Sequence, residues 1–167
     1  MTYGIFDDNE LELINASKLI LSDGVQRLKD RNTLFSNNRS DRRAMLAARS
    51  LLTDKLLADY GSLRYEVAIV VFFDIQGRLI TTEEFKQGKA AECEISTRLL
   101  VEYVIKHGAA AILLAHNHPS GDNTPSSQDL RMTRHLKEWL AHIDCQVIDH
   151  LVLNGEGASS IIGEWND

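Results

Sequence analysis

The chain has 167 residues, of which 44% are hydrophobic and 25% are charged, as is typical of a globular protein that folds in water. Its net charge of −6 argues against a broad basic surface for a phosphate backbone, although four arginines could form a local basic patch: Arg39, Arg42, Arg43 and Arg49. No apolar run approaches the roughly 18 residues of a membrane span, and no secretory signal is visible at the start, so we expect a cytoplasmic protein.

Residues 1–62 are expected to form a helical extension. Apolar residues recur at near-helical spacing over 11–21, which predicts a first helix. The stretch 31–40 is polar and rich in Asn and Ser, which favours a loop. A second amphipathic helix is predicted over 41–60, where small and aliphatic residues share one face.

Residues 63–167 are expected to form a separate domain. Strands and helices alternate there, which predicts an α/β fold with a mixed β-sheet flanked by helices on both faces. The predicted strands are 65–73, 78–85, a short edge strand at 91–95, 109–115, 147–153 and 158–162. The predicted helices are 97–106, capped by Ser96, and 126–143, in which Leu136 and Trp139 are expected to pack in the core.

The most informative segment runs from His116 to Asp129, directly after a predicted buried strand. The carboxyl end of such a strand is where α/β folds place ligands and catalytic groups. Residues two apart in an extended chain point to the same side, so His116 and His118 can converge on one ion. The first turn of the following helix can bring Asp129 back to them. Two imidazoles and one carboxylate make a three-ligand zinc set that leaves a fourth position open for water.

Two points stay open from the residues alone. Ser126 and Asp129 also fit the S-x-x-D capping box that begins many helices, in which Ser126 caps and Asp129 reaches back to the backbone. A zinc-bound water also needs a base, for which Glu83 and Glu84 are the candidates. Neighbouring side chains of a strand face opposite ways, so only one of these glutamates can point into the site, and spacing does not choose between them.

We interpret the other residues that could take part in catalysis or metal binding mainly as structural. Cys93 and Cys145 belong to no CxxC pair, which indicates neither a cysteine zinc site nor a disulfide framework. His150 follows Asp149 in a predicted strand, where a core or hydrogen-bonding role is favoured over a role in holding a metal ligand. Asn117, between the two histidines, either orients a ligand or shapes the loop.

The pattern H-x-H, seven residues, Ser, two residues, Asp resembles the JAMM (MPN+) metalloprotease motif. The run from His116 to Asp122, followed by Thr124, Pro125 and Ser126, closely resembles the bacterial RadC family. Three other pieces agree with that family: Gly77–Ile80 with Glu83, Ala109–Ile112, and Asp149–Leu151. The resemblance covers about residues 65–163.

The resemblance implies a JAB/MPN domain, which is similar to the α/β/α sandwich of cytidine deaminases. It implies that zinc is bound by His116, His118 and Asp129. It also places the catalytic glutamate at Glu83 and gives Ser126 the role of donating a hydrogen bond to a tetrahedral oxyanion.

Two departures from the family pattern are visible. Family members typically carry a Gly-Thr pair after the catalytic glutamate, but here Gly88 is followed by Lys89. The N-terminal part also lacks the helix-hairpin-helix segment of many full-length relatives, which weakens an expectation of DNA contact.

The function expected first is that of a zinc metallohydrolase, a metallopeptidase or isopeptidase acting on a peptide or isopeptide substrate. One alternative is a DNA-repair-associated nuclease or accessory protein of the RadC type. Another is a non-catalytic MPN interaction module. The N-terminal helices are candidates for a homodimer contact, for covering the site or for binding a partner.

Overall fold

The computed structural model describes residues 39–75, 78–86 and 95–163, without the side chains of residues 39–48 and 86. A five-stranded sheet with the order β2-β1-β3-β4-β5 forms its centre. The strands are β1 (Val67–Phe73), β2 (Leu79–Lys86), β3 (Ala111–Asn117), β4 (Gln146–Leu153) and β5 (Ala158–Ser160). Strands β3 and β4 run parallel and the other neighbouring pairs are antiparallel, so the sheet is mixed.

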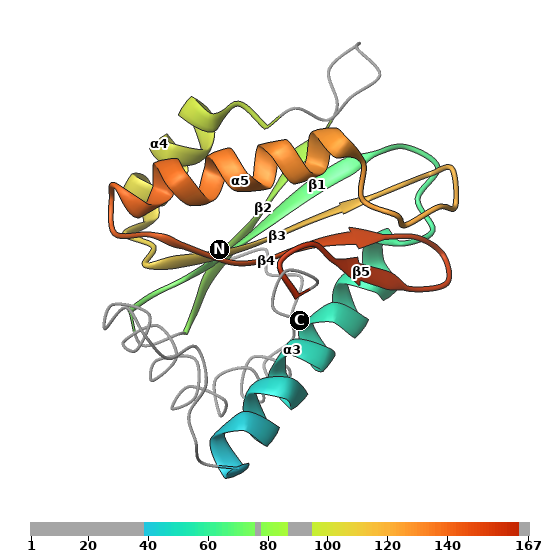
Figure 1. The fold of residues 1–167 in the computed structure, drawn as a ribbon, viewed down its shortest axis with the longest axis horizontal. Helices are drawn as coiled ribbons and strands as arrows, with labels where there is room; N and C mark the ends of the chain where they lie inside the picture. Colours follow the sequence, from blue (N-terminus) through green and yellow to red (C-terminus); the bar gives the residue numbers. More distant parts are fainter. Residues whose placement is uncertain (1–38, 76–77, 87–94, 164–167) are drawn as a thin grey trace.

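Helices cover both faces of this sheet (Figure 1). Helix α3 (Arg39–Tyr60) lies on one face, and helices α4 (Thr97–His107) and α5 (Ser127–Ala141) lie on the other. The expected α/β class, with a mixed sheet between helices, is therefore confirmed. No helix in the described ranges is both long enough and apolar enough to cross a membrane.

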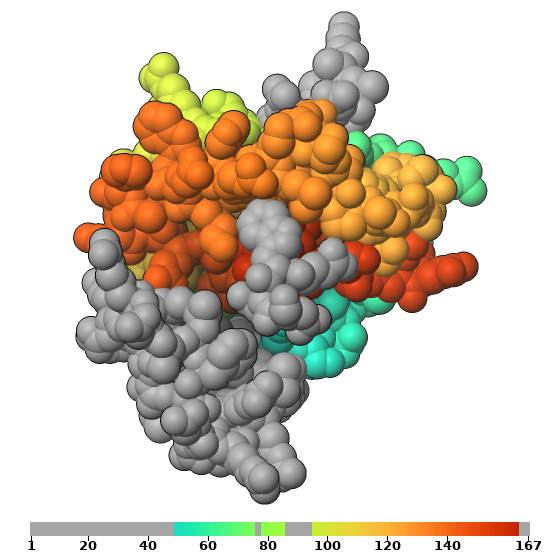
Figure 2. All heavy atoms as spheres, in the orientation of Figure 1, coloured from blue at the N-terminus to red at the C-terminus, as the bar shows by residue number. Residues whose placement is uncertain are grey.

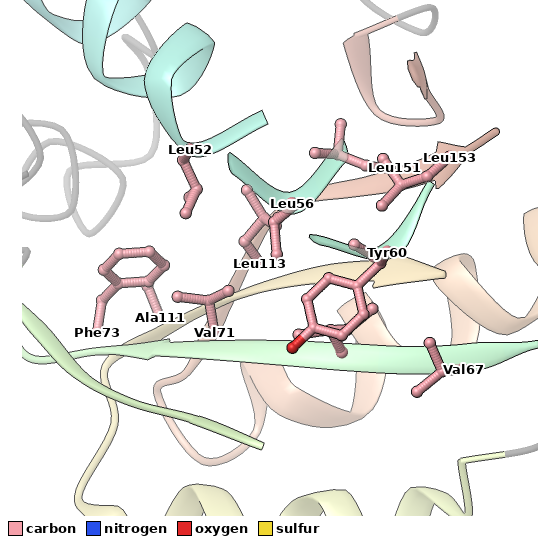
Figure 3. Close-up of a cluster of buried hydrophobic side chains, with 12 residues drawn as sticks. Leu52, Leu56, Tyr60, Val67, Val71, Phe73, Ala111, Leu113, Leu151 and Leu153 are labelled. Atoms are coloured by element: carbon pink, nitrogen blue, oxygen red, sulfur yellow. The ribbon is translucent and has the colours of Figure 1, made fainter. Parts of the chain in front are cut away.

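The central strands β1 and β3 are buried along their whole length, which is why their sequences are almost continuously apolar. Their side chains alternate between two cores. One core lies under α3 and is shown in Figure 3; it includes Leu56, Tyr60 and Ile69. The other lies under α4 and α5 and includes Ala68 and Val70. A residue's position in the alternation thus decides which helices it meets.

The elements mostly begin and end within a few residues of the predicted limits, but two differences matter for the site. Strand β3 ends at Asn117 instead of Ala115, because His116 still pairs with Ala68 of β1. Helix α5 starts after Ser126, which is its N-cap. Ser96 occupies the N-cap position of α4, but its side chain makes no capping hydrogen bond, so that detail of the prediction was wrong.

Trp139 does not pack in the core as expected, since it is 62% exposed. Leu136 and Leu140 are fully buried and define the inner stripe of α5, and Trp139 lies beside that stripe. The helix predicted over 11–21 and nearly all of the edge strand predicted over 91–95 lie outside the described residues. The division of the chain at residues 62 and 63 stays a prediction, although the end of α3 packs into the same core as the sheet.

Arg49, one of the four arginines considered for a basic patch, is held by an ion pair with Asp149 of β4. Asp149 is 2% exposed and also accepts hydrogen bonds from the Ser160 hydroxyl and the backbone N–H groups of His150 and Ile162. This carboxylate therefore joins α3, β4 and β5 on the α3 side of the sheet.

Candidate metal centre

Three side chains lie close together where β3 ends and α5 begins. The Nε2 atoms of His116 and His118 are 3.0 Å apart, and the Asp129 carboxylate lies 3.4 Å from the first and 3.8 Å from the second. All three ligand atoms lie within 4.8 Å of one another. The predicted ligand residues are thus brought together from two elements, β3 with its following loop and the first turn of α5.

The loop after β3 turns His118 back toward His116. Its backbone N–H donates to the Leu153 carbonyl at the end of β4 (2.8 Å), which ties the loop to the sheet. Gly121 then turns the chain with a φ of +84°, a conformation that favours glycine. As a result, Nδ1 of His118 lies 2.7 Å from the carbonyl oxygen of Asp122. A carbonyl only accepts, so Nδ1 carries a proton, and in the neutral ring the Nε2 lone pair is left free.

Asp129 is oriented by the capping box of α5. Its Oδ2 accepts from the backbone N–H of Ser126 (2.7 Å) and from the Ser126 hydroxyl (2.6 Å), while its own N–H donates back to that hydroxyl (3.1 Å). Oδ1 is left to face His116. Burial alone would raise the pKa of Asp129, but its contact with the His116 ring and its hydrogen bonds from Ser126 outweigh burial and hold that pKa well below its ordinary value. The two interpretations of Ser126 and Asp129 are therefore compatible, because the cap aims the ligand.

The second nitrogen of His116 faces a third histidine. Nδ1 of His116 lies 2.8 Å from Nε2 of His150, and Nδ1 of His150 lies 2.6 Å from the Thr133 hydroxyl. His150 is 1% exposed, and burial, followed by the nearby His116, lowers its pKa to about 3. His150 is therefore a neutral imidazole, and it lies on the buried side of His116.

The donor set fits a divalent cation such as zinc. Nε2 of His116 lies 3.0 Å from Nε2 of His118 and 3.4 Å from the ionised Asp129 carboxylate, distances at which unshared lone pairs repel. A cation between them converts this repulsion into coordination, and two imidazoles with one carboxylate leave a further position open. The side chain of His116 is 5% exposed but that of His118 is 20% exposed, so the open side of the cluster faces the loop and solvent.

Asn117 turns away from this cluster, as alternation along the strand requires. It is fully buried, accepts from the backbone N–H of Val67 (2.8 Å), and donates to the carbonyls of Leu63 and Tyr65. Of the two roles considered for it, the structure supports shaping of the chain: Asn117 fastens the end of β3 to the segment that enters β1.

Glu83 and Glu84 lie on opposite faces of β2. Glu83 pairs with Val70, whose side chain belongs to the core under α4 and α5, the face that carries His116. Glu84 pairs with Ile69 on the α3 face and accepts a hydrogen bond from the Tyr60 hydroxyl (2.7 Å). Burial, together with this contact, raises the pKa of Tyr60. Only Glu83 therefore shares a face with the ligands.

Glu83 is not part of the three-residue cluster itself. The sheet register puts its Cα roughly 12 Å from that of His116, two strands across and two residues along. Its Oε1 lies 3.3 Å from Nε2 of His107, close enough for an ion pair but not aligned as a hydrogen bond. The assignment of Glu83 as a base stays a prediction, and so does the role of Ser126 toward an oxyanion.

A comparison with family models matches residues 46–165 to the RadC-like JAB domain. The chain belongs to the RadC-like JAB domain family. The segment from His118 to Ser126 forms the loop that connects the end of β3 to the start of α5 (Figure 1). In the space-filling view this segment lies beside the N-terminal end of α5, within the surface formed by the orange residues (Figure 2).

Curated relatives of this RadC-like JAB domain are named UPF0758 proteins. One from Burkholderia cenocepacia is 37% identical over 115 residues, which cover 69% of this chain and 45% of the relative. Another from Vibrio cholerae is 45% identical over 92 residues, which cover 55% of this chain and 59% of the relative. The chain thus spans about half the length of the curated relatives it matches.

Among solved structures, a cytidine deaminase from Mycobacterium leprae aligns with 70% of this chain and 92% of its own, at 15% identity and a TM-score of 0.31. That likeness is too slight to bear on fold or function. The α/β architecture rests on the strands and helices described above, and the family on the match over 46–165.

Proposed function

We propose that this RadC-like JAB domain is a zinc-dependent hydrolase that cleaves amide bonds, as a peptidase or an isopeptidase. One observation carries the proposal: three ligand atoms of His116, His118 and Asp129, from two elements, lie within 4.8 Å of one another, with the open side toward solvent. Such three-ligand sites with an open position are typical of catalytic zinc.

Bound between these residues, zinc would lower the pKa of a water toward about 7 and polarise a substrate carbonyl. The chain itself has to supply a base. Glu83 is proposed for that role because it is the glutamate on the ligand-bearing face of β2. It would take the proton of the attacking water and pass it to the leaving amine. To do so, its carboxylate has to turn from His107 toward the cluster.

Ser126 is proposed to donate its hydroxyl proton to the oxyanion that develops during attack. In the structure the Ser126 hydroxyl donates its proton to Oδ2 of Asp129. It would therefore have to break this hydrogen bond and form one to the oxyanion instead. Asp129 would keep its orientation during the exchange, since the Ser126 N–H still holds Oδ2 at 2.7 Å. Such a donor, aimed at charge that forms in the transition state, contributes strongly to acyl-transfer catalysis.

The proposal is tested with Glu83→Gln and the matched variant Glu84→Gln, which changes the same group on the opposite face. The purified full chain would be assayed for zinc and iron by elemental analysis, because two histidines and a carboxylate also suit ferrous iron. Turnover would be followed on a fluorogenic peptide library and on peptides joined through a lysine side chain. We expect one zinc in all three proteins and a loss of about 100-fold or more in turnover in Glu83→Gln only.

Full turnover in Glu83→Gln would remove Glu83 from the mechanism. Wild-type protein that binds no zinc would support the non-catalytic module instead. A parallel assay of binding and cleavage with single-stranded and duplex DNA at low salt covers the nuclease or accessory function. Among the described residues no observation favours that function, since Arg49 is paired with Asp149.

A further inference from the structure

A row of hydrogen bonds leads from His116 into the interior and returns to the helix that carries Asp129. Nδ1 of His116 meets Nε2 of His150 at 2.8 Å, and Nδ1 of His150 meets the Thr133 hydroxyl at 2.6 Å. The Thr133 hydroxyl lies 2.6 Å from the backbone carbonyl of Asp129. His116, Thr133 and His150 are all at most 4% exposed, so each polar atom in the row depends on its neighbour for a partner.

The last member of the row fixes the direction of every proton in it. The Asp129 carbonyl can only accept, so the Thr133 hydroxyl donates its single proton there. That hydroxyl must then accept from Nδ1–H of His150. A buried neutral imidazole carries one proton, so Nε2 of His150 is an acceptor, and it receives the proton on Nδ1 of His116. In the neutral His116 ring, Nε2 is consequently unprotonated, and it faces the cluster.

The opposite tautomer of His116 would prevent metal binding. If His116 carried its proton on Nε2, it could donate to Nε2 of His118, 3.0 Å away, or to the Asp129 carboxylate, 3.4 Å away, and a proton would then occupy the place of the metal. In His118, the Asp122 carbonyl beside Nδ1 keeps the ring proton on Nδ1 and away from Nε2. His116 has no carbonyl beside it, and depends on His150 and Thr133 for the same protection.

We propose that Thr133 and His150 are positioning residues that hold His116 as the Nδ1–H tautomer, with its Nε2 lone pair directed at the ion. The inference rests on the proposed metal site but not on the reaction carried out there. It also couples the two elements of the centre, because the row begins at a ligand on β3 and ends at the backbone of the α5 ligand.

The tautomers can be read directly by nitrogen-15 NMR of the imidazole rings in the zinc-free full chain, at a pH where the rings carry one proton each. We expect His116 and His150 both to be protonated at Nδ1 and unprotonated at Nε2. A wild-type protein in which His116 is protonated at Nε2, or in which its two tautomers are equally populated, overturns the proposal. This measurement involves no variant and no hydrolysis, so it remains decisive if the protein proves to have no peptidase activity.

Thr133→Val removes the hydroxyl with little change of shape, and Thr133→Ser is the matched variant that keeps it. Without an acceptor at position 133, His150 should move its proton to Nε2 and push the proton of His116 to its own Nε2. We expect zinc affinity, measured by competition with a chelator, to fall about 10- to 100-fold in Thr133→Val and to stay near wild type in Thr133→Ser. Equal affinities in folded Thr133→Val and Thr133→Ser, or unchanged tautomers in Thr133→Val, would overturn the proposal.

Discussion

The Ser126 hydroxyl and the Asp129 carboxylate hold each other in both directions at the first turn of α5. The hydroxyl donates to Oδ2 of Asp129 at 2.6 Å and accepts from the Asp129 N–H at 3.1 Å. A residue pair that would be assigned to helix capping in most proteins here also points the second carboxylate oxygen at His116, 3.4 Å away. Helix stability and ligand geometry are therefore linked through one serine.

Ser126→Ala should weaken both properties at once. We expect the free energy of unfolding to fall by about 1 kcal/mol, the usual loss for an N-cap hydroxyl, as measured by urea denaturation with chelator present. We also expect weaker zinc binding in a competition assay, because Oδ2 of Asp129 loses a hydrogen bond that orients it. Ser126→Thr keeps the hydroxyl and should stay close to wild type. Loss of stability without any loss of zinc affinity would show that the cap does not orient the ligand.

Zinc itself should stabilise the fold, because the ligands come from β3, its following loop and α5, and are assembled only in the folded chain. At a free zinc concentration 100 times the dissociation constant, the expected gain is about 2.7 kcal/mol. Thermal denaturation with and without zinc measures it. Glu83→Gln should keep the full gain, whereas Asp129→Asn should lose most of it. A gain of equal size in Asp129→Asn would place the zinc elsewhere.

The ligand cluster could be predicted from the sequence because one short segment supplies it. His116, His118 and Asp129 are separated only by a turn, so strand alternation and a helix start are enough to bring them together. The choice of Glu83 over Glu84 needed family resemblance, because it depends on how β2 pairs with β1. That pairing is a long-range property of the sheet.

The supporting residues could not be predicted in the same way. His150 reaches His116 through the parallel register of β3 and β4, and Thr133 reaches His150 from the buried side of α5. Neither contact leaves a local pattern in the sequence; the one signal is a histidine within a mostly apolar strand. Trp139 illustrates the same limit, since hydrophobicity alone did not reveal that it lies beside the buried stripe.

Burial of His150 predicts acid sensitivity of the zinc-free fold. Its pKa is lowered to about 3 in the folded chain from an ordinary value near 6.5, so the unfolded chain binds more protons between these two pH values. The contribution to stability is complete above about pH 6.5 and is lost as the pH falls, at up to about 1.4 kcal/mol per pH unit. Urea denaturation at pH 7.5, 6 and 5 measures the slope.

The matched protein for that experiment is His150→Gln, which removes the titrating ring. We expect a smaller slope for His150→Gln than for wild type between pH 5 and 6.5. The window stays above the ordinary pKa of aspartate, so the depressed pKa of Asp129 adds little to the difference. Identical slopes in the two proteins would mean that His150 does not remain neutral in the fold.

Asn117 should prove structural although it stands between two candidate ligands. Asn117→Asp keeps an acceptor for the Val67 N–H but loses both donors to the Leu63 and Tyr65 carbonyls and adds a charge at a fully buried position. We expect a loss of about 3 kcal/mol or more in unfolding free energy. The zinc affinity of the fraction that remains folded should change little, because the side chain points away from the cluster. A selective loss of zinc with unchanged stability would contradict this assignment.

Gly61 ends α3 at a point where the chain has no room for a side chain. A Cβ there would lie 2.5 Å from the carbonyl oxygen of Asn154 and 2.7 Å from that of Leu57, both backbone atoms that a rotamer change does not move. Asn154 in turn donates from Nδ2 to the Gly121 carbonyl (2.7 Å), so a displacement would reach the loop that carries His118. Gly61→Ala should therefore destabilise the fold by about 3 kcal/mol and weaken zinc binding as well.

Gly155→Ala is the matched control for Gly61→Ala, because it adds the same methyl group to the turn after Asn154. There the added Cβ would meet only the Ser62 hydroxyl at 3.5 Å, an ordinary van der Waals contact. Its unfolding free energy and zinc affinity should stay within about 0.5 kcal/mol of wild type, as for most surface substitutions. If both variants lost stability equally, the close approach at Gly61 would not be the cause, and the contact between the end of α3 and Asn154 would have no special role in holding the metal loop.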